Sequence, residues 1–262
     1  MRFAHVSDLH MDVHGVASPD HGLTANDVTS AIAQDLTAIS DALDLIVVSG
    51  DLTERADAET FAAFEQMLGD IGLPLIVVPG NHDGPAGMHA YSAFSQKFAS
   101  WDITNRVVEI AGARFLGLDT CIEDVTEGAL EDEGLALLAD EIARDADSSL
   151  VIVMHHPPLV LGLQKFDGFC RLEGRERLMK ILGAAQDRVI ILSGHVHRPY
   201  TAVEGRISCH IAGSIIAPYD SALPFGDFPI RPTTLQDFYF VHDLKPGGSH
   251  VVTAQRVRGL VP

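Results

Sequence analysis

Five short motifs in the sequence carry side chains that bind divalent metal ions, and they are spread along most of the chain. In order, the motifs are Asp8-Leu9-His10, Gly50-Asp51, Gly80-Asn81-His82-Asp83, His155-His156-Pro157-Pro158 and Gly194-His195-Val196-His197. Carboxylate, amide and imidazole ligands without a thiolate suit Mn, Fe or Zn better than copper. Two such ions held about 3.5–4 Å apart can lower the pKa of a bound water molecule and stabilise an in-line displacement. The motifs therefore point to a site for two metal ions.

The spacing inside the motifs supports this interpretation. Asp8 and His10 are two residues apart, and so are His195 and His197, so both members of a pair point the same way in an extended segment. Asp51 follows a glycine, which leaves room for a close approach, and it is placed to bridge the two ions. Taken singly, each motif also has a structural explanation, such as a turn or a chance pair among thirteen histidines. Their order and shared context favour one common site.

Each motif follows a run of apolar residues that favour β-strands. The runs are 3–6, 45–48, 75–78, 150–153 and 189–192, and a further strand is expected over 114–118. Between the runs, apolar residues recur at helical spacing, which predicts helices over 27–43, 61–71, 91–98, 135–142 and 175–182. A capping box from Thr24 to Asp27 would open the first helix. This alternation predicts an α/β fold, in which ligands bind at the carboxyl ends of the strands.

The C-terminal part of the sequence has a different pattern. Residues 200–212 alternate in polarity and predict one hairpin, and residues 238–241 and 250–257, separated by a Pro-Gly-Gly sequence, predict a second. The segment between the hairpins is rich in Pro, Asp and Phe, which is typical of an irregular loop. No repeat and no linker divides the chain. We therefore predict a single domain over residues 1–262, with 214–262 as a C-terminal loop and hairpin extension.

Composition argues against several classes of protein. The net charge of -18 argues against a nucleic-acid polymer as partner, because nucleic-acid binders need a basic surface. The three cysteines are far apart and form no Cys-x-x-Cys pair, so neither a disulfide framework nor a zinc knuckle is indicated. No apolar stretch is long enough for a membrane span, and the N-terminus lacks a signal-peptide pattern. We predict a cytoplasmic protein that acts on a small molecule and not on a membrane, with homo-oligomer formation left open.

The complete set of motifs resembles the calcineurin-like metallophosphoesterase superfamily over residues 1 to about 213. The stretches 48–53, 79–83 and 154–158 are most similar to one branch, the bacterial class III cyclic nucleotide phosphodiesterases and their glycerophosphodiesterase relatives. The resemblance implies a four-layer α/β/β/α sandwich of two mixed sheets flanked by helices, built around a binuclear metal centre. Protein Ser/Thr phosphatases instead carry Gly-Asp-x-x-Asp-Arg-Gly and Gly-Asn-His-Glu, which this sequence lacks, so protein phosphatase activity is not expected.

The resemblance also implies a role for each motif residue. One ion would be held by Asp8, His10, Asp51 and His197. The second ion would be held by Asp51, Asn81, His155 and His195. His82 matches the family's catalytic histidine and, together with Asn81, would contact a phosphoryl oxygen or the leaving group. His156 is left as a supporting or structural residue.

The predicted function is hydrolysis of phosphodiesters by a hydroxide that bridges two ions, with small diesters such as 3',5'-cyclic nucleotides as the expected substrates. Fe and Mn are the expected ions, and Zn is an alternative. A second hypothesis is a glycerophosphodiesterase or phosphomonoesterase on the same centre, and a third is a metal-binding scaffold without turnover. Residues 162–173 and 214–231 are candidate pocket elements, whose aromatic side chains either shape the leaving-group cavity or pack on themselves. Glu54 either orients His82 or is a solvated loop charge.

Overall fold

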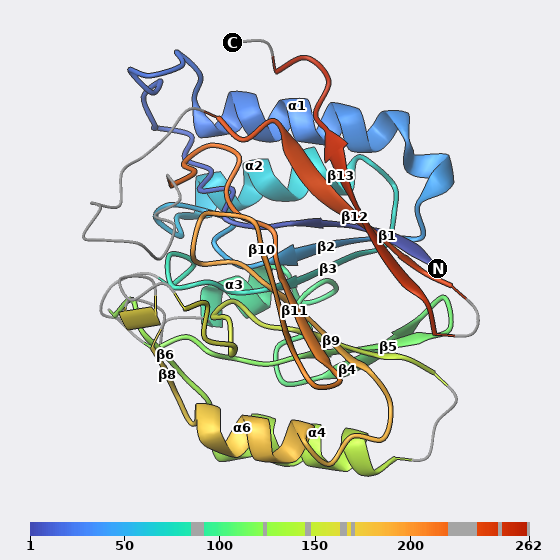
Figure 1. Ribbon diagram of the computed structural model, residues 1–262. Helices are drawn as coiled ribbons and strands as arrows, with labels where there is room; N and C mark the ends of the chain where they lie inside the picture. Colours follow the sequence, from blue (N-terminus) through green and yellow to red (C-terminus); the bar gives the residue numbers. More distant parts are fainter. Residues whose placement is uncertain are drawn as a thin grey trace.

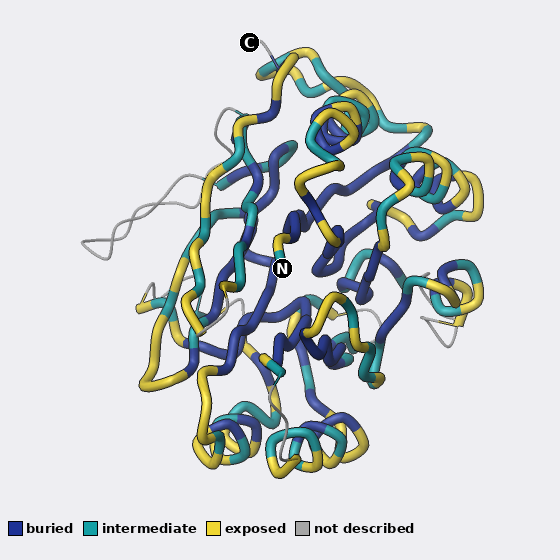
Figure 2. The backbone as a smooth tube through the Cα atoms, turned by 90° about the vertical axis from the view of Figure 1, so that its right-hand side faces the viewer, coloured by how far each residue is buried: buried dark blue, intermediate teal, exposed yellow. Residues whose placement is uncertain are grey.

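Two β-sheets lie face to face in the middle of the molecule, and helices cover the outer face of each (Figure 1). The residues described by the computed structural model are 1–84, 92–122, 125–144, 148–162, 167–168, 171–219, 235–245 and 248–260. Figure 2 shows the buried backbone running through the interior and the outward faces of the helices exposed to solvent. The predicted four-layer α/β/β/α sandwich of two mixed sheets is confirmed.

The first sheet joins the two ends of the chain. Its strands are β1 (Arg2–Val6), β2 (Leu45–Ser49), β3 (Leu75–Val78), β12 (Phe238–Leu244) and β13 (His250–Arg256), in the spatial order β13-β12-β1-β2-β3. Strands β1, β2 and β3 are parallel, whereas β12 is antiparallel to β1 and β13 is antiparallel to β12. The C-terminal hairpin is therefore built into the sheet beside the first strand. The division into one domain with an extension stays a prediction.

The second sheet is formed by the middle of the chain. Its spatial order is β10 (Tyr200–Glu204), β11 (Ile207–Ile211), β9 (Val189–Ser193), β7 (Leu150–Val153), β5 (Ala113–Gly117) and β4 (Val107–Ile110). The four central strands are parallel, and the two edge strands β10 and β4 are antiparallel to their neighbours. A small parallel pair is formed by β6 (Gly128–Ala129) and β8 (Leu172–Glu173). Strand β4 and the β6–β8 pair were not predicted from the sequence.

The helices follow the predicted periodicity with shifted ends. They are α1 (Ala25–Ala38), α2 (Ala58–Gly69), α3 (Ser92–Lys97), α4 (Asp132–Ala143) and α6 (Arg175–Leu182), with a 3₁₀ helix at Ser40–Ala42. The capping box from Thr24 to Asp27 opens α1 as expected. The predicted helix over 27–43 is too long, because α1 ends at Ala38 and a 3₁₀ turn leads into β2.

Three apolar clusters hold the four layers together. The first packs α1 and α2 on the first sheet and includes Leu36 and Phe64. The second packs α4 and α6 on the second sheet and includes Leu138. The third lies between the two sheets, where Phe3 and Phe115 meet edge to face with ring centroids 5.6 Å apart. Burying each such side chain contributes about 1.5–3 kcal/mol, so the sheets form a firm base for the loops at their edges. In the described part of the chain, no helix is both long enough and apolar enough to cross a membrane.

Candidate metal centre

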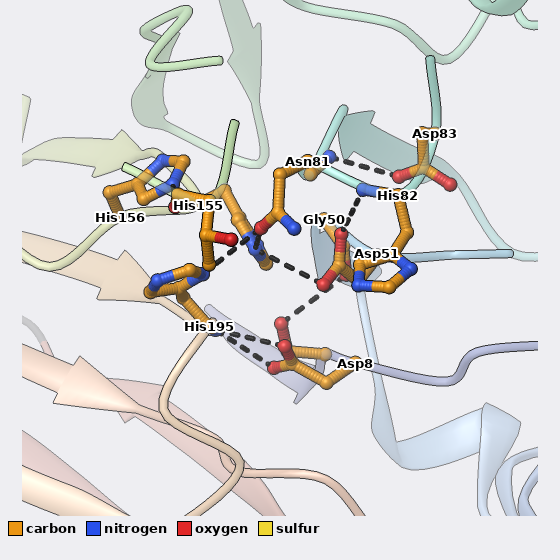
Figure 3. A network of polar contacts seen from close by, with 12 residues as sticks. Asp8, Gly50, Asp51, Asn81, His82, Asp83, His155, His156 and His195 are labelled. Carbon is orange, nitrogen blue, oxygen red and sulfur yellow. Dashed lines mark hydrogen bonds and ion pairs between the residues drawn. The ribbon is translucent and has the colours of Figure 1, made fainter. Parts of the chain in front are cut away.

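The five motifs follow the carboxyl ends of five parallel strands, three in the first sheet and two in the second. The strands are β1, β2, β3, β7 and β9. Backbone hydrogen bonds tie neighbouring loops together, from Asp8 N to the Gly50 carbonyl and from Gly194 N to the His155 carbonyl, both at 3.0 Å. The His195 N–H donates to Asp8 Oδ1 at 2.9 Å, which links the two sheets (Figure 3). The structure thus brings together all of the predicted site residues.

The backbone at this edge is strained. Eight described residues other than glycine have a positive φ, and five of them are predicted site residues: Asp8, His10, Asp51, His195 and His197. The left-handed conformation costs roughly 1–2 kcal/mol per residue, and such strain is concentrated at functional sites. The extended geometry that we expected for the Asp-x-His and His-x-His pairs is therefore wrong. The side chains converge because the chain turns at both members of each pair, while the residues between them, Leu9 and Val196, are buried in the apolar clusters.

Two glycines are required by close contacts at this edge. A Cβ added to Gly50 would lie 2.4 Å from His155 Nδ1, and one added to Gly194 would lie 1.9 Å from Ser7 Oγ. Gly50 also has a φ of 97°, which other residues rarely adopt. The expectation that the glycine before Asp51 permits a close approach is confirmed.

A first group of donor atoms is formed by two imidazoles and two carboxylates. His10 Nε2 and His197 Nε2 face each other at 2.9 Å. Asp51 Oδ2 lies 3.6 Å from His10 Nε2, and Asp8 Oδ1 lies 3.6 Å from His197 Nε2. One donor atom from each of the four residues lies within 4.8 Å of all the others, a spacing that fits a single ion.

A second group of donor atoms adjoins the first and shares Asp51 with it. Asn81 Oδ1 lies 3.1 Å from His155 Nε2 and 3.0 Å from His195 Nδ1. Asp51 Oδ2 lies 3.4 Å from His155 Nε2. Figure 3 shows these side chains, which come from the loops after β2, β3, β7 and β9, converging on one place. Two donor groups around one carboxylate provide the arrangement that a pair of ions requires.

Oxygen acceptors on the far side fix the direction of three imidazoles. His155 Nδ1 lies 2.9 Å from the Ser49 carbonyl, and His197 Nδ1 lies 2.8 Å from the Ala217 carbonyl. His10 Nδ1 lies 2.8 Å from Glu54 Oε2. Each Nδ1 can donate its proton to that oxygen. The Nε2 atom then has no proton, and its lone pair faces the other metal-binding side chains. Outer hydrogen bonds of this kind orient histidine ligands in metal sites.

The electrostatic environment favours positive charge between these side chains. Burial works to lower the pKa of His155, but the Asp51 carboxylate raises it to about 9. Burial likewise opposes the charge on His10, yet its hydrogen bond to Glu54 and the Asp51 and Asp8 carboxylates raise its pKa to about 8. Burial would also raise the pKa of Asp51, but His155 and His10 hold it well below its usual range. A site that holds protons this firmly suits a metal cation, which binds to the same lone pairs.

Comparison with known proteins identifies the family. The calcineurin-like phosphoesterase family matches residues 1–199, which contain all five motifs. The chain belongs to the calcineurin-like phosphoesterases. The predicted resemblance and the prediction of a metal-dependent phosphoric ester hydrolase are thereby confirmed.

Curated relatives of this phosphoesterase are similar over most of its length. A probable glycerophosphodiester phosphodiesterase GpdQ from Arcobacter nitrofigilis is 27% identical over 205 residues, which cover 76% of this chain and 74% of the relative. A cAMP/cGMP dual specificity phosphodiesterase from Mycobacterium tuberculosis is 26% identical over 228 residues, 85% of this chain and 70% of the relative. Among solved structures, a dimetal phosphatase from Danio rerio has the same fold, with a TM-score of 0.67, 12% identity and coverage of 97% and 98% of the two chains.

Several residues around the phosphoesterase site were not assigned from the sequence. Asp83 is fully buried and accepts hydrogen bonds from Gly80, Leu52 and Thr53, so it fastens the third motif to the second. Burial and the nearby Asp51 carboxylate raise the pKa of Asp83 to about 6. A carboxylate three residues after a glycine in a loop was the signal that could have revealed this role.

The residues after β11 also support the phosphoesterase site. Ser214 Oγ donates to the Asp8 carbonyl at 2.7 Å, and the Tyr219 ring stacks on the His197 ring with centroids 4.9 Å apart.

His156 is turned away from the donor groups, because its Nδ1 contacts Thr120 Oγ1 and its Nε2 contacts the Thr126 carbonyl. Phe166, Phe169 and Phe225, which belong to the candidate pocket elements 162–173 and 214–231, lie outside the described residues.

A cavity of about 460 Å³ opens over the phosphoesterase's donor groups. It is lined by residues of the segments 10–25, 51–55 and 216–219, by the third and fifth motifs and by Thr126. Glu54 lines it, with Oε2 2.8 Å from His10 Nδ1 and 3.6 Å from His82 Nδ1. Glu54 therefore contacts His10 more closely than His82, a contact that the sequence analysis did not consider. The cavity is large enough for a small organic phosphate ester.

Proposed function

We propose that the protein hydrolyses small phosphodiesters at a centre of two metal ions. One ion would be held by Asp8, His10, Asp51 and His197, and the other by Asp51, Asn81, His155 and His195. The observation that carries this proposal is the position of Asp51 Oδ2, which lies 3.6 Å from His10 Nε2 and 3.4 Å from His155 Nε2. The names of the relatives, which include glycerophosphodiester and cyclic nucleotide phosphodiesterases, support the same class of reaction.

The donor set fits Fe and Mn, with Zn as an alternative, because it mixes oxygen and nitrogen ligands and contains no thiolate. When bound, the two ions would supply an activated water molecule and neutralise negative charge on the phosphoryl oxygens. The protein's own contribution is to hold the donors in place. The carbonyl oxygens of Ser49 and Ala217 fix two of the imidazoles, and the strained loops fix the carboxylates.

His82 is the residue that we assign to proton transfer. Its backbone N–H donates to Asp51 Oδ1 at 2.9 Å, and its ring Nδ1 lies 3.3 Å from the Glu54 carbonyl. The ring lines the cavity and belongs to neither donor group. With Nδ1 directed at Glu54, Nε2 is the atom left to hold a phosphoryl oxygen or to protonate the departing alkoxide. The Asn81 amide would donate a hydrogen bond to the same phosphoryl group.

The lining of the cavity favours a diester over a monoester. A monoester carries a second negative charge, and an additional cationic side chain would stabilise it. Among the described lining residues, Arg55 is the single lysine or arginine, and its Nη2 lies 2.8 Å from Asp12 Oδ2. Asp12 and Glu54 add negative charge to the lining. Val16, Leu23 and Ile216 provide apolar surface for the organic part of an ester. Cyclic nucleotides remain our first choice of substrate, and glycerophosphodiesters are the second.

The experiment that tests this proposal compares four substrates with the full-length, Mn²⁺-loaded protein. The rates of hydrolysis of bis(p-nitrophenyl) phosphate and p-nitrophenyl phosphate are compared first, which separates diesterase from monoesterase activity. Cyclic AMP against glycerophosphocholine then separates the first choice of substrate from the second. We expect kcat/KM for the diester to exceed that for the monoester by about tenfold or more.

Two results would decide against the proposal. Faster turnover of p-nitrophenyl phosphate would identify a phosphomonoesterase on the same centre. No turnover of any substrate, with both ions bound, would favour a metal-binding scaffold. The cytoplasmic location, the identity of the ions and the oligomeric state stay predictions.

A further inference from the structure

Four histidines gather between the two sheets, away from the five motifs. They are His5 on β1, His210 on β11, His242 on β12 and His250 on β13. His5, His210 and His242 are buried, and the His242 ring stacks on Phe3 with centroids 4.9 Å apart. Neither the metal centre nor the proposed hydrolysis uses any of them. We call these four residues the inter-sheet histidine cluster.

Several ring nitrogens of this cluster lack a partner. Within the described part of the chain, His5 Nδ1, His210 Nε2 and His242 Nε2 are buried and make no hydrogen bond. Leaving a buried polar atom unsatisfied costs about 1–3 kcal/mol. Of these atoms, His210 Nε2 lies on one of three rings that are close together, so it is available to a ligand that binds imidazole nitrogen.

The arrangement of three of the rings repeats a feature of the metal centre. His242 Nδ1 and His250 Nε2 face each other at 2.9 Å, the same separation as between His10 Nε2 and His197 Nε2. The centroids of His210, His242 and His250 lie 5.3, 4.9 and 5.1 Å apart. Three imidazoles on one tetrahedral ion, with metal–nitrogen bonds of about 2.0–2.1 Å, have ring centroids about 5 Å apart. The centroids of the three rings thus lie at the spacing of a three-histidine site.

We propose that the inter-sheet histidine cluster is a separate site for a borderline divalent cation such as Zn²⁺, with His210, His242 and His250 as ligands. Three neutral imidazoles are an established donor set for zinc, with a water in the fourth position. In the described part of the chain, the groups of donor atoms that lie within 4.8 Å of one another are Asp8, His10, Asp51 and His197, and His10, Glu54 and His82, so the nitrogens of the cluster do not yet have this spacing. Binding of one ion by all three residues would therefore require the His210 ring to turn about its side-chain bonds and bring a nitrogen to the ion.

The surroundings of the cluster suit this role. Burial lowers the pKa of His210 to about 4, and burial together with Arg188 lowers the pKa of His250 to about 4, so both imidazoles are neutral at pH 7 and keep a lone pair. His250 is half-buried on the edge strand β13, which gives an ion a route from solvent. The ion would join β13 and β12 to β11 and so fasten one sheet to the other.

Counting bound ions tests the proposal without any need for turnover. The full-length protein is stripped with a chelator, dialysed against Zn²⁺ and analysed for zinc per chain. The wild type should hold one ion more than His250→Gln, because the half-buried His250 can change without disturbing the core. His14→Gln is the matched control, since His14 is an exposed histidine outside both sites and should keep the full zinc content. Reloading with Co²⁺ should add a tetrahedral absorption band that His250→Gln lacks.

Two further variants separate this site from the first centre. Asp51→Asn should lose ions from the first centre while the cobalt band that depends on His250 remains. His242→Phe keeps the stacking on Phe3 and should also lose the extra ion. If this variant fails to fold, the zinc content of His250→Gln decides whether the cluster binds the ion. Equal zinc content in the wild type and His250→Gln would overturn the proposal. So would an extra ion that disappears in Asp51→Asn but persists in His250→Gln.

Discussion

At the scale of single residues, the Asp51 carboxylate stands between two groups of donors. Its Oδ2 is within 3.6 Å of a nitrogen in each group, and its Oδ1 accepts the His82 N–H at 2.9 Å. Asp51 therefore connects the ligands proposed for both ions with the residue proposed for proton transfer. Substitutions of Asp51 should therefore act mainly by weakening metal binding.

Asp51→Asn keeps the shape of the side chain and removes its charge. We expect both ions to bind more weakly by roughly 100-fold or more, because the shared anionic ligand is lost. Metal content after dialysis measures this directly. Asp12→Asn is the matched control, since Asp12 is a buried carboxylate in the same cavity that pairs with Arg55. Wild-type metal content in Asp51→Asn would show that the bridge is misassigned.

His82→Ala should separate turnover from metal binding. Because His82 lies in neither donor group, the variant should keep its ions. We expect kcat to fall by roughly 100-fold or more on esters with poor leaving groups, where a proton must reach the departing oxygen. The loss should be smaller for bis(p-nitrophenyl) phosphate, whose leaving group needs no proton. Parallel loss of metal and activity would contradict the assigned role.

The sequence predicted which residues meet at the site but not how they meet. Asp8, Asp51 and His155 could be named because each follows a strand and has the right chemistry. The left-handed backbone at Asp8 could not be predicted, because non-glycine residues avoid it unless the surrounding structure imposes it. The contact from Glu54 to His10 depends on two loops brought together by the sheet, so local pattern did not reveal it.

At the scale of elements, local signals placed the helices well and their ends less well. Arg175–Leu182 forms α6 with the predicted bounds, because its apolar residues keep a strict helical period. The helix predicted to end at Leu43 stops at Ala38, since the following residues form a 3₁₀ turn that leads into β2. Strand β4 was missed because an edge strand with half-buried residues lacks a strong apolar run.

The N-cap of α2 gives a prediction at this scale. Asp57 Oδ1 accepts the Thr60 N–H at 2.8 Å, so Asp57→Ala should lower the free energy of unfolding by about 1 kcal/mol. Asp57→Asn is the control, because asparagine caps almost as well. Denaturant unfolding of the three proteins at neutral pH measures the difference. Equal stability of Asp57→Ala and the wild type would contradict the capping role.

Acid should weaken the effect of this cap. Burial works to raise the pKa of Asp57, but hydrogen bonds from Thr60 hold it below its ordinary value. The stability that the ionised carboxylate adds is therefore present above the ordinary pKa and is lost as pH falls through the lowered value. The difference between Asp57→Ala and the wild type should shrink over that range, whereas a difference independent of pH would argue against a charged cap.

At the scale of the whole molecule, the two ends of the chain close the first sheet. Strand β12 pairs along β1, the Met1 amino group donates to the Leu244 carbonyl, and the Tyr239 hydroxyl donates to Asp35 in α1 at 2.8 Å. Both hairpins could be predicted from turns and alternation. The partner of the second hairpin could not, because pairing between residues more than two hundred positions apart leaves no local trace in one sequence.

Removal of residues 235–262 tests the importance of this closure. The truncated chain would expose the hydrogen-bonding edge of β1, which carries Asp8 at its end, and would leave the Asp35 carboxylate buried without its tyrosine. We expect cooperative thermal unfolding to be lost. A shorter truncation after Val257 keeps the hairpin and should stay folded with a lower Tm. Cooperative unfolding of the longer truncation at the wild-type Tm would show that the hairpin is dispensable.

Crystals of the Mn²⁺-loaded protein would give the most direct test of the central proposal, through anomalous diffraction at the manganese edge. Two peaks should appear on either side of the Asp51 carboxylate, one within bonding distance of His10 and His197 and the other within bonding distance of Asn81 and His155. A single peak away from Asp51, or ordered manganese that contacts none of these residues, would contradict the binuclear centre and the hydrolysis derived from it.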